Sequence, residues 1–332
     1  MFLTTDIDKL NDKLHCLFSD KFDLFICYNS FEDRCVSIAS NISIDFFRTA
    51  LIITDKEPLE NEEENLNKLS DIFRDKKRIA RVDLSFPLTV ADKIMEELVF
   101  INSSVPLNRV FIDITTFTHE TLLMLFAIFR EKFHDAEIVC GYINAQEYSV
   151  DEEHPQIKWL SRGIGDVRSV LGYSGSLHPS KENHLIVIMG YEYERAARII
   201  DVIDPDCLSI GYNTEKTSTA DRDRDASAGY ANLVKILAAY YEQTSDFEVP
   251  CNNPYEAYIA ICKKIEEIGE NVNIMLVPMS NKISTVGASL AALENRNVQI
   301  CYAPALAYNT TAYSLAGNTC YIFSFDYPKN SD

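Results

Sequence analysis

RVFIDITTFTHETLLMLFAIFREKF, residues 109–133, is the stretch of sequence that decides the fold. Residues 110–114 are branched or aromatic apolar side chains except for Asp113, which is typical of a buried strand with a polar group near its end. A turn rich in hydroxyl groups follows, and residues 122–133 then carry apolar side chains at helical spacing. A strand that ends in polar side chains and leads into a helix indicates an open α/β sheet, whose ligands bind at the carboxyl ends of the strands.

The same alternation of strand and helix extends through the first half of the chain. Strand-like segments occur at residues 22–28, 50–54, 79–84 and 136–143. Helical segments of roughly 12 residues separate them, as expected for βαβ units. Such units have right-handed connections and build a parallel sheet.

The second half of the chain repeats these segments in the same order. Arg195 matches Arg34 at an offset of 161 (195 − 34), and Pro254 matches Pro87 at 167 (254 − 87). The segment 273–293 matches 109–129 at 164 (273 − 109), and an Asn-Leu-x-Lys sequence occurs at both 65–68 and 232–235. These matches predict an α/β protein of two tandem, internally duplicated Rossmann-like domains with mainly parallel sheets.

The duplication predicts where the domains begin and end. We expect a first Rossmann-like domain at residues 1–175 and a second at 184–328, joined by a linker at 176–183. Gly, Ser and Pro are frequent in residues 172–183, as in many linkers. The segments 165–173 and 317–325 each predict a sixth, edge strand for the half that precedes them.

Composition limits the possible functions. The chain is 47% hydrophobic, has a formal charge of −19, and has no run near the roughly 18 apolar residues of a membrane span. Direct binding of nucleic acid is not expected, because that activity usually requires a basic face. The N-terminus lacks the basic and apolar regions of a signal peptide. Nine cysteines without a CxxC pair indicate reduced thiols in the cytoplasm, and no metal or cofactor is predicted.

Polar side chains after the first strand of each half are the first candidate ligands. Ser30 fits a helix cap, but Arg34 and Arg195 stand where a helix begins, and a cation there opposes the helix dipole. Two interpretations of these arginines remain open. Each forms an ion pair with a neighbouring carboxylate, or each contacts a bound anion.

The turn after the fourth strand supplies the second group of candidates. Thr116 or Thr118 fits a helix N-cap, whereas the whole hydroxyl-rich turn suits the phosphate or ribose of a nucleotide-like ligand. In the second half, Lys282 overlays Thr118 at an offset of 164 (282 − 118), one residue before the position of His119. The complete set of candidate ligand-binding residues is Ser30, Arg34, Asp113, Thr115, Thr116, Thr118, His119, Arg195, Ser280, Asn281 and Lys282.

The pattern Asp113-x-Thr115-x-x-x-His119 resembles the signature of CRISPR-associated Rossmann-fold (CARF) sensor domains. That signature has Asp or Asn, then Ser or Thr two residues later, and a basic residue after three more. The resemblance implies binding of cyclic oligoadenylates by a pair of domains, here two halves of one chain, in prokaryotic antiviral defence. His119 stands where the family usually has Lys or Arg, and Val277 stands where the second half should have the acid.

Together these observations predict a cytoplasmic protein that senses a nucleotide or second messenger and signals to a partner protein. One alternative is a nucleotide-processing enzyme, such as a phosphodiesterase or nucleoside hydrolase. In that case His119 would act with Ser280 or Lys282 as acid and base. The other alternative is a scaffold subunit of a larger complex that binds no ligand.

Overall fold

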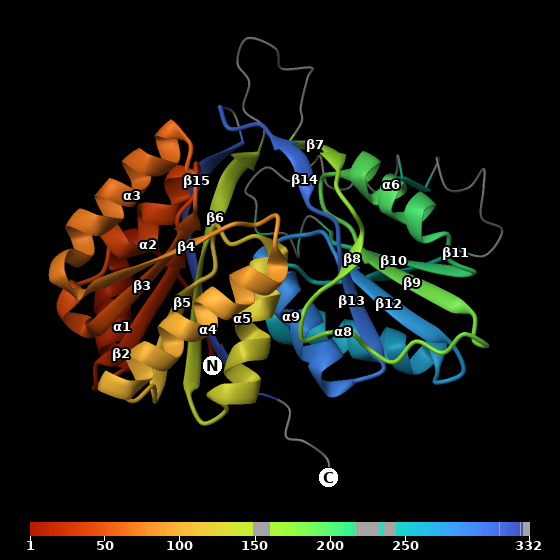
Figure 1. Cartoon of the computed structure of the whole chain (residues 1–332), viewed down its shortest axis with the longest axis horizontal. Helices are drawn as coiled ribbons and strands as arrows, with labels where there is room; N and C mark the ends of the chain where they lie inside the picture. The colour runs from red at the N-terminus through yellow and green to blue at the C-terminus, as the bar shows by residue number, and fades with distance from the viewer. Residues whose placement is uncertain are drawn as a thin grey trace. The chain divides into compact units, whose positions relative to one another are not determined.

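The computed structural model describes residues 1–148, 160–214, 216, 219, 233–234, 244–311, 313–325 and 327. It is an α/β structure that divides into two compact units (Figure 1). Unit 1 combines Met1–Gln146 with Ser314–Tyr327, and unit 2 contains Glu147–Tyr313.

Unit 1 is built on one sheet of seven strands. The strands are β1 (Phe2–Asp6), β2 (Phe22–Tyr28), β3 (Phe47–Asp55), β4 (Lys77–Val82), β5 (Arg109–Asp113), β6 (Glu137–Tyr148) and β15 (Ser314–Phe325). Their order across the sheet is β1–β15–β6–β5–β2–β3–β4. The five strands from β2 to β6 are parallel. β1 is antiparallel to β15.

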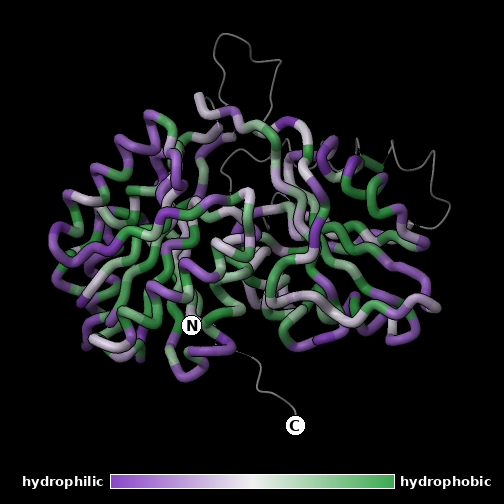
Figure 2. Tube along the Cα trace, in the orientation of Figure 1, coloured by the Kyte–Doolittle hydropathy of each residue, from purple (hydrophilic) through white to green (hydrophobic). Residues whose placement is uncertain are grey.

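Helices cover both faces of this sheet. They are α1 (Leu10–Leu17), α2 (Ser37–Ser40), α3 (Glu60–Phe73), α4 (Pro87–Ser104) and α5 (His119–Lys132), with short 3-10 turns at Ile7–Lys9, Asp33–Val36, Ile44–Phe46 and Arg74–Lys76. Helices α1, α2 and α3 enclose one core with β2, β3 and β5. Helices α4 and α5 pack against each other. Figure 2 shows the matching pattern, with hydrophobic strands and helices of mixed character.

Unit 2 repeats this architecture. Its strands are β7 (Ser161–Ile164), β8 (Arg168–Ser169), β9 (Asn183–Ile188), β10 (Cys207–Tyr212), β11 (Thr244–Glu248), β12 (Asn273–Pro278), β13 (Val298–Tyr302) and β14 (Ala305–Tyr308), and its described helices are α6 (Tyr193–Ile203), α8 (Pro254–Ile268) and α9 (Lys282–Glu294). The main sheet has the order β11–β10–β9–β12–β13–β8, and β14 pairs separately with β7. Helix α6 packs against the core on one face. Helices α8 and α9 pack so closely that a Cβ on Gly287 would lie 2.7 Å from the Ala257 Cβ.

The two sheets share one strand order. The parallel strands run β4–β3–β2–β5–β6 in unit 1 and β11–β10–β9–β12–β13 in unit 2. This order confirms the predicted Rossmann-like fold class with mainly parallel sheets. Its switch point, where the order reverses, lies between β2 and β5 in unit 1 and between β9 and β12 in unit 2. Of the second Asn-Leu-x-Lys sequence, only residues 233 and 234 lie within the described part of the chain.

The prediction that each half keeps its own sixth strand is wrong. β8, from the predicted first half, is antiparallel to β13 of unit 2, with Cys301 opposite Ser169. β15, from the predicted second half, lies between β1 and β6 of unit 1. Hydrophobic alternation identifies a segment as a strand, but it cannot specify which of two similar sheets that strand joins.

The exchange of strands also shifts the division of the chain. Residues 147–175, placed in the first domain by the prediction 1–175, belong to unit 2. Residues 314–327, placed in the second domain by the prediction 184–328, belong to unit 1. The predicted linker 176–183 leads into β9, which begins at Asn183, and lies within unit 2.

Candidate functional site

Asp113 ends β5 at the switch point of unit 1, and its carboxyl group is buried. One carboxylate oxygen, Oδ1, accepts hydrogen bonds from Thr115 N at 3.1 Å and Thr115 Oγ1 at 2.5 Å. The other, Oδ2, is buried without a hydrogen-bond partner among the described residues. Burial raises the pKa of Asp113 to about 7, against the opposing effects of the Thr115 hydrogen bonds and the Arg34 charge.

The threonines after Asp113 hold the turn to its neighbours. Thr115 Oγ1 also accepts a hydrogen bond from Ile143 N in β6 at 3.1 Å. Thr116 Oγ1 donates to the Tyr28 carbonyl oxygen at the end of β2, at 2.6 Å. The predicted hydroxyl groups therefore do meet at the switch point, where they connect the turn after β5 to the end of β2 and to the middle of β6.

Ser30 and Arg34 both lie buried in the loop after β2. Ser30 Oγ accepts a hydrogen bond from Glu32 N at 3.3 Å, so its hydroxyl helps to form the turn. Arg34 Nη2 donates to Glu32 Oε2 at 2.6 Å, and Arg34 Nη1 donates to the Ile143 carbonyl oxygen at 3.1 Å. The interpretation of Arg34 as part of a structural ion pair therefore has direct geometric support.

Unit 2 contains the same arrangement around Arg195. Arg195 Nη1 donates to Glu192 Oε2 at 2.9 Å, and Nη2 donates to the carbonyl oxygen of Ala303, just after β13. Ala303 corresponds to Ile143 at an offset of 160 (303 − 143). Each arginine thus joins the first loop of its unit to the next segment of the sheet: Arg34 bonds to Ile143 within β6, and Arg195 bonds to Ala303 just after β13.

A serine completes each arrangement, from β15 in unit 1 and from β7 in unit 2. Ser314, the first residue of β15, donates to Glu32 Oε2 at 2.6 Å. Ser161, the first residue of β7, donates to Glu192. We call these groups the latch of unit 1 (Arg34, Glu32, Ser314) and the latch of unit 2 (Arg195, Glu192, Ser161). The sequence contained a signal for the arginines, but none for their distant partners.

Helices α5 and α9, which follow β5 and β12, begin with equivalent N-caps. Thr118 is the N-cap of α5, and its Oγ1 accepts a hydrogen bond from Thr121 N at 3.0 Å. Asn281 is the N-cap of α9, and its Oδ1 accepts from Ser284 N at 3.0 Å. His119 and Lys282 are therefore the first residues of their helices and equivalent to each other. The sequence alignment, which matched Lys282 with Thr118, was wrong by one residue because it carried the strand offset through the turn.

The remaining candidate, Ser280, precedes this cap in unit 2. Its Oγ lies 3.1 Å from the Cys251 Sγ. The backbone approaches Gly190 closely here, since a Cβ on Gly190 would lie 2.4 Å from the Met279 carbonyl oxygen. In unit 2 the first and fourth loops therefore pack directly on each other at the switch point, and a larger residue at position 190 would separate them.

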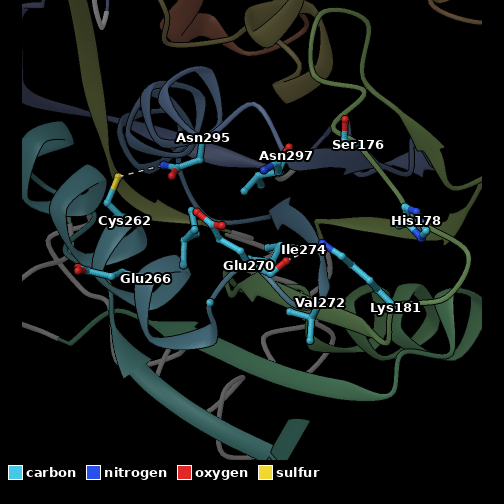
Figure 3. Close-up of a pocket in the computed structure, with 13 residues that line it drawn as sticks. Ser176, His178, Lys181, Cys262, Glu266, Glu270, Val272, Ile274, Asn295 and Asn297 are labelled. Carbon is cyan, nitrogen blue, oxygen red and sulfur yellow. Dashed lines mark hydrogen bonds between the residues drawn. The ribbon is translucent and has the colours of Figure 1, made fainter. Parts of the chain in front are cut away.

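A surface groove of about 520 Å³ lies at the opposite edge of the unit 2 sheet (Figure 3). It lies beside the amino ends of β12 and β13 and the C-termini of α8 and α9, and Lys181 Nζ donates to the Glu270 carbonyl oxygen within it at 2.6 Å. No pattern in the sequence indicates this groove, since three of its residues belong to the predicted linker. The lining residues are Ser176, His178, Lys181, Cys262, Ile265, Glu266, Gly269, Glu270, Val272, Ile274, Asn295, Asn297 and Val298.

None of the eleven predicted site residues lines this groove. Its lining contains two carboxylates, Glu266 and Glu270, and one lysine, Lys181, beside two helix C-termini, which carry a partial negative charge. Within the described residues, no group of three or more His, Cys, Asp or Glu side chains is arranged to hold a metal ion. All nine cysteines are free thiols. No helix in the described part of the chain has the length and apolar character needed to cross a membrane.

The fold and these turns define a Rossmann-like α/β protein of two repeated units. Comparison with protein-family models finds no match for the chain, and comparison with curated proteins finds none either. The geometry of the two switch points therefore carries the functional argument.

Proposed function

We propose that this protein binds a nucleotide or nucleotide-like second messenger in the cytoplasm and signals its occupancy to a partner protein. The observation that carries the proposal is the equivalence of His119 and Lys282. His119 is the first residue of α5, which follows β5, and Lys282 is the first residue of α9, which follows β12. Both positions lie beside a switch point. Both side chains are partly exposed.

The physical chemistry of helix ends supports an anionic ligand. The first turn of a helix carries a partial positive charge and unpaired N–H groups, so it attracts phosphate. A basic side chain at the first position opposes that charge unless an anion offsets both. Two repeats that differ in most polar groups of this turn both have a basic residue there, which suits a phosphate site.

Binding is favoured over catalysis by the state of the neighbouring hydroxyl groups. Thr115, Thr116 and Thr118 in unit 1, and Ser284 and Thr285 in unit 2, all make hydrogen bonds within the protein. Groups held in this way support a turn and are poor nucleophiles. The resemblance to CARF sensor domains, carried by Asp113, Thr115 and His119, favours the same class of function in antiviral defence.

Thermal unfolding with a panel of cyclic and linear nucleotides tests the proposal. A ligand at 100 times its dissociation constant stabilises the folded state by about 2.7 kcal/mol, which raises the melting temperature by several degrees. His119→Ala and Lys282→Ala should each reduce that rise. The matched controls are His134→Ala and Lys263→Ala, since both side chains are exposed and away from the helix starts.

The alternatives give different results in the same experiment. Absence of any shift with every nucleotide would contradict the proposal, as would shifts that persist in both His119→Ala and Lys282→Ala. Chromatography of the nucleotide after incubation identifies an enzyme, because an enzyme consumes the ligand and loses this activity in His119→Ala. A scaffold subunit would show neither shift nor consumption and would still co-purify with its partner.

A further inference from the structure

The latch of unit 1 is linked to Asp113 by a continuous set of hydrogen bonds. Thr115 Oγ1 donates to Asp113 Oδ1 at 2.5 Å and accepts from Ile143 N at 3.1 Å. The carbonyl oxygen of the same residue, Ile143, accepts from Arg34 Nη1 at 3.1 Å. Arg34 continues to Glu32, and Glu32 accepts from Ser314 of the exchanged strand. A change at Asp113 therefore reaches β15 through groups that are in contact.

In the described part of the chain, the charge of Arg34 acts on that of Asp113. The titratable groups whose pKa values depend on its charge are the thiols of Cys27 in β2, Cys35 beside Arg34, Cys140 in β6 and Cys320 in β15. Burial raises the pKa of each thiol well above neutral pH, so the thiols stay uncharged. Arg34 is the cation whose charge acts on Asp113, and Glu32 and Asp33 are the acids that share its loop.

We propose that protonation of Asp113 controls how tightly the exchanged strand β15 is held in unit 1. With the carboxyl protonated, Arg34 stays on Glu32 and the Ile143 carbonyl oxygen, and the latch is closed. With the carboxylate charged, its buried and unpartnered Oδ2 competes for the Arg34 guanidinium. Glu32 then loses the cation that holds its carboxylate in place, and its contact with Ser314 weakens. This device stands independently of the proposed nucleotide binding.

The charge change falls in a physiological range of pH. Burial raises the pKa of Asp113 to about 7 while the latch is closed. Opening the latch brings Arg34 closer and lowers that pKa, because an adjacent cation stabilises the carboxylate. By linkage, the equilibrium constant for opening rises about tenfold per pH unit between the pKa of Asp113 in the open latch and its higher pKa in the closed latch. This equilibrium constant levels off above pH 7.

Unit 2 provides an internal reference. It has the same latch, but Val277 stands where unit 1 has Asp113, at an offset of 164 (277 − 113). The Val277 side chain is buried and apolar, and it has no proton to lose. The latch around Arg195 should therefore hold β7 equally well at every pH in this range.

Amide hydrogen exchange of the intact chain tests whether the charge of Asp113 controls the hold on β15. The exchange is measured by mass spectrometry and corrected for the intrinsic rate at each pH. Protection of β15 in the wild type should fall at least tenfold between pH 5 and pH 7 and change little from pH 7 to pH 8. Peptides that contain β7 and β13 should keep constant protection. In Asp113→Asn the protection of β15 should no longer depend on pH.

Three results would contradict this pH-dependent latch. They are constant protection of β15 in the wild type, an equal fall in the protection of β7 and β13 as pH rises, or the same fall in the protection of β15 in Asp113→Asn. If Asp113→Asn does not fold, the wild-type comparison of β15 with β7 and β13 still decides the question. Thr115→Val provides a second variant, since it removes the hydroxyl between Asp113 and Ile143 and should weaken the pH dependence of β15 protection.

Discussion

Arg34 and Arg195 illustrate what a sequence states about a residue and what it omits. The position of each arginine at the start of a helix correctly indicated an anionic partner. For Arg34 that partner is Glu32, two residues away, but the second acceptor, Ile143, lies 109 residues further along the chain. Only the fold brings this carbonyl oxygen to the loop, so the sequence left both the ion pair and the ligand contact open.

Arg34→Ala should destabilise the protein strongly. The substitution leaves the nearly buried Glu32 carboxylate without its cation, and breaking a buried pair in this way typically costs about 3–5 kcal/mol. Urea denaturation measures the loss. Lys9→Ala is the control, because the Lys9–Asp6 pair is exposed to solvent and should contribute little to stability. Equal effects of the two substitutions would contradict the structural role of Arg34.

Asp113→Asn should change how stability depends on pH. The pKa of Asp113 is about 7 in the folded protein, above the value of about 3.9 in an unfolded chain. The folded state therefore binds this proton more tightly, and the stabilisation is complete below pH 4 and lost as pH rises to 7. We therefore compare the free energy of unfolding of Asp113→Asn with that of the wild type. The difference, variant minus wild type, should increase by up to about 1.4 kcal/mol for each pH unit of rise in this window.

Urea unfolding at pH 4.5, 5.5, 6.5 and 7.5 measures this difference. Asp33→Asn is the control, because the Asp33 side chain is exposed and its substitution should leave the pH profile unchanged. A constant difference between Asp113→Asn and the wild type across these pH values would show that the carboxyl group does not titrate as described.

At the scale of single elements, local patterns predicted most of the structure. β2, β5 and α5 form where the runs of apolar residues place them. The helix start at Thr118 was one of two predicted N-caps, since a threonine side chain before an apolar helix is a local signal. The alignment of α5 with α9 failed by one residue, because turns of different length connect the repeated elements.

The two N-caps should differ in their contribution to stability. Thr118→Ala removes the cap hydrogen bond from Thr121 N and the local bond to Thr121 Oγ1, and it should cost about 1 kcal/mol. Asn281→Ala removes the cap and also the bonds from Asn281 Nδ2 to the Cys251 carbonyl oxygen and to Thr219 Oγ1, so it should cost about 2 kcal/mol or more. Chemical denaturation measures both, and Thr118→Ser should be nearly neutral. A larger loss in Thr118→Ala would contradict this order.

At the scale of the whole molecule, the sequence revealed a repeat but not its connections. Six blocks in the same order implied two similar sheets, and both sheets have the implied strand order. The sixth strands were assigned to the wrong sheets, because two repeated sheets offer two edges of similar character. The contacts that decide between them, such as Ser314 with Glu32 and Thr319 N with Asn144 Oδ1, join residues far apart in the sequence.

Cleavage between the fragments that share unit 1 tests the exchange of strands. A protease site introduced between residues 154 and 155 divides the chain into a piece with β1 to β6 and a piece with β7 to β15. Since β15 lies between β1 and β6, the pieces should elute together in native buffer and separate in denaturant. A second site after residue 327 serves as a control for the inserted sequence. Independent elution of the two pieces in native buffer would contradict the strand exchange.

The central functional claim is that the helix starts at His119 and Lys282 hold a phosphate-containing ligand. The most direct measurement is mass spectrometry of small molecules released by denaturation, after the purified protein is incubated with a metabolite extract and washed. We predict that the wild type releases a nucleotide in defined ratio to protein, and that His119→Ala with Lys282→Ala releases none. Release of no nucleotide from the wild type, or of equal amounts from this double variant, would contradict the claim.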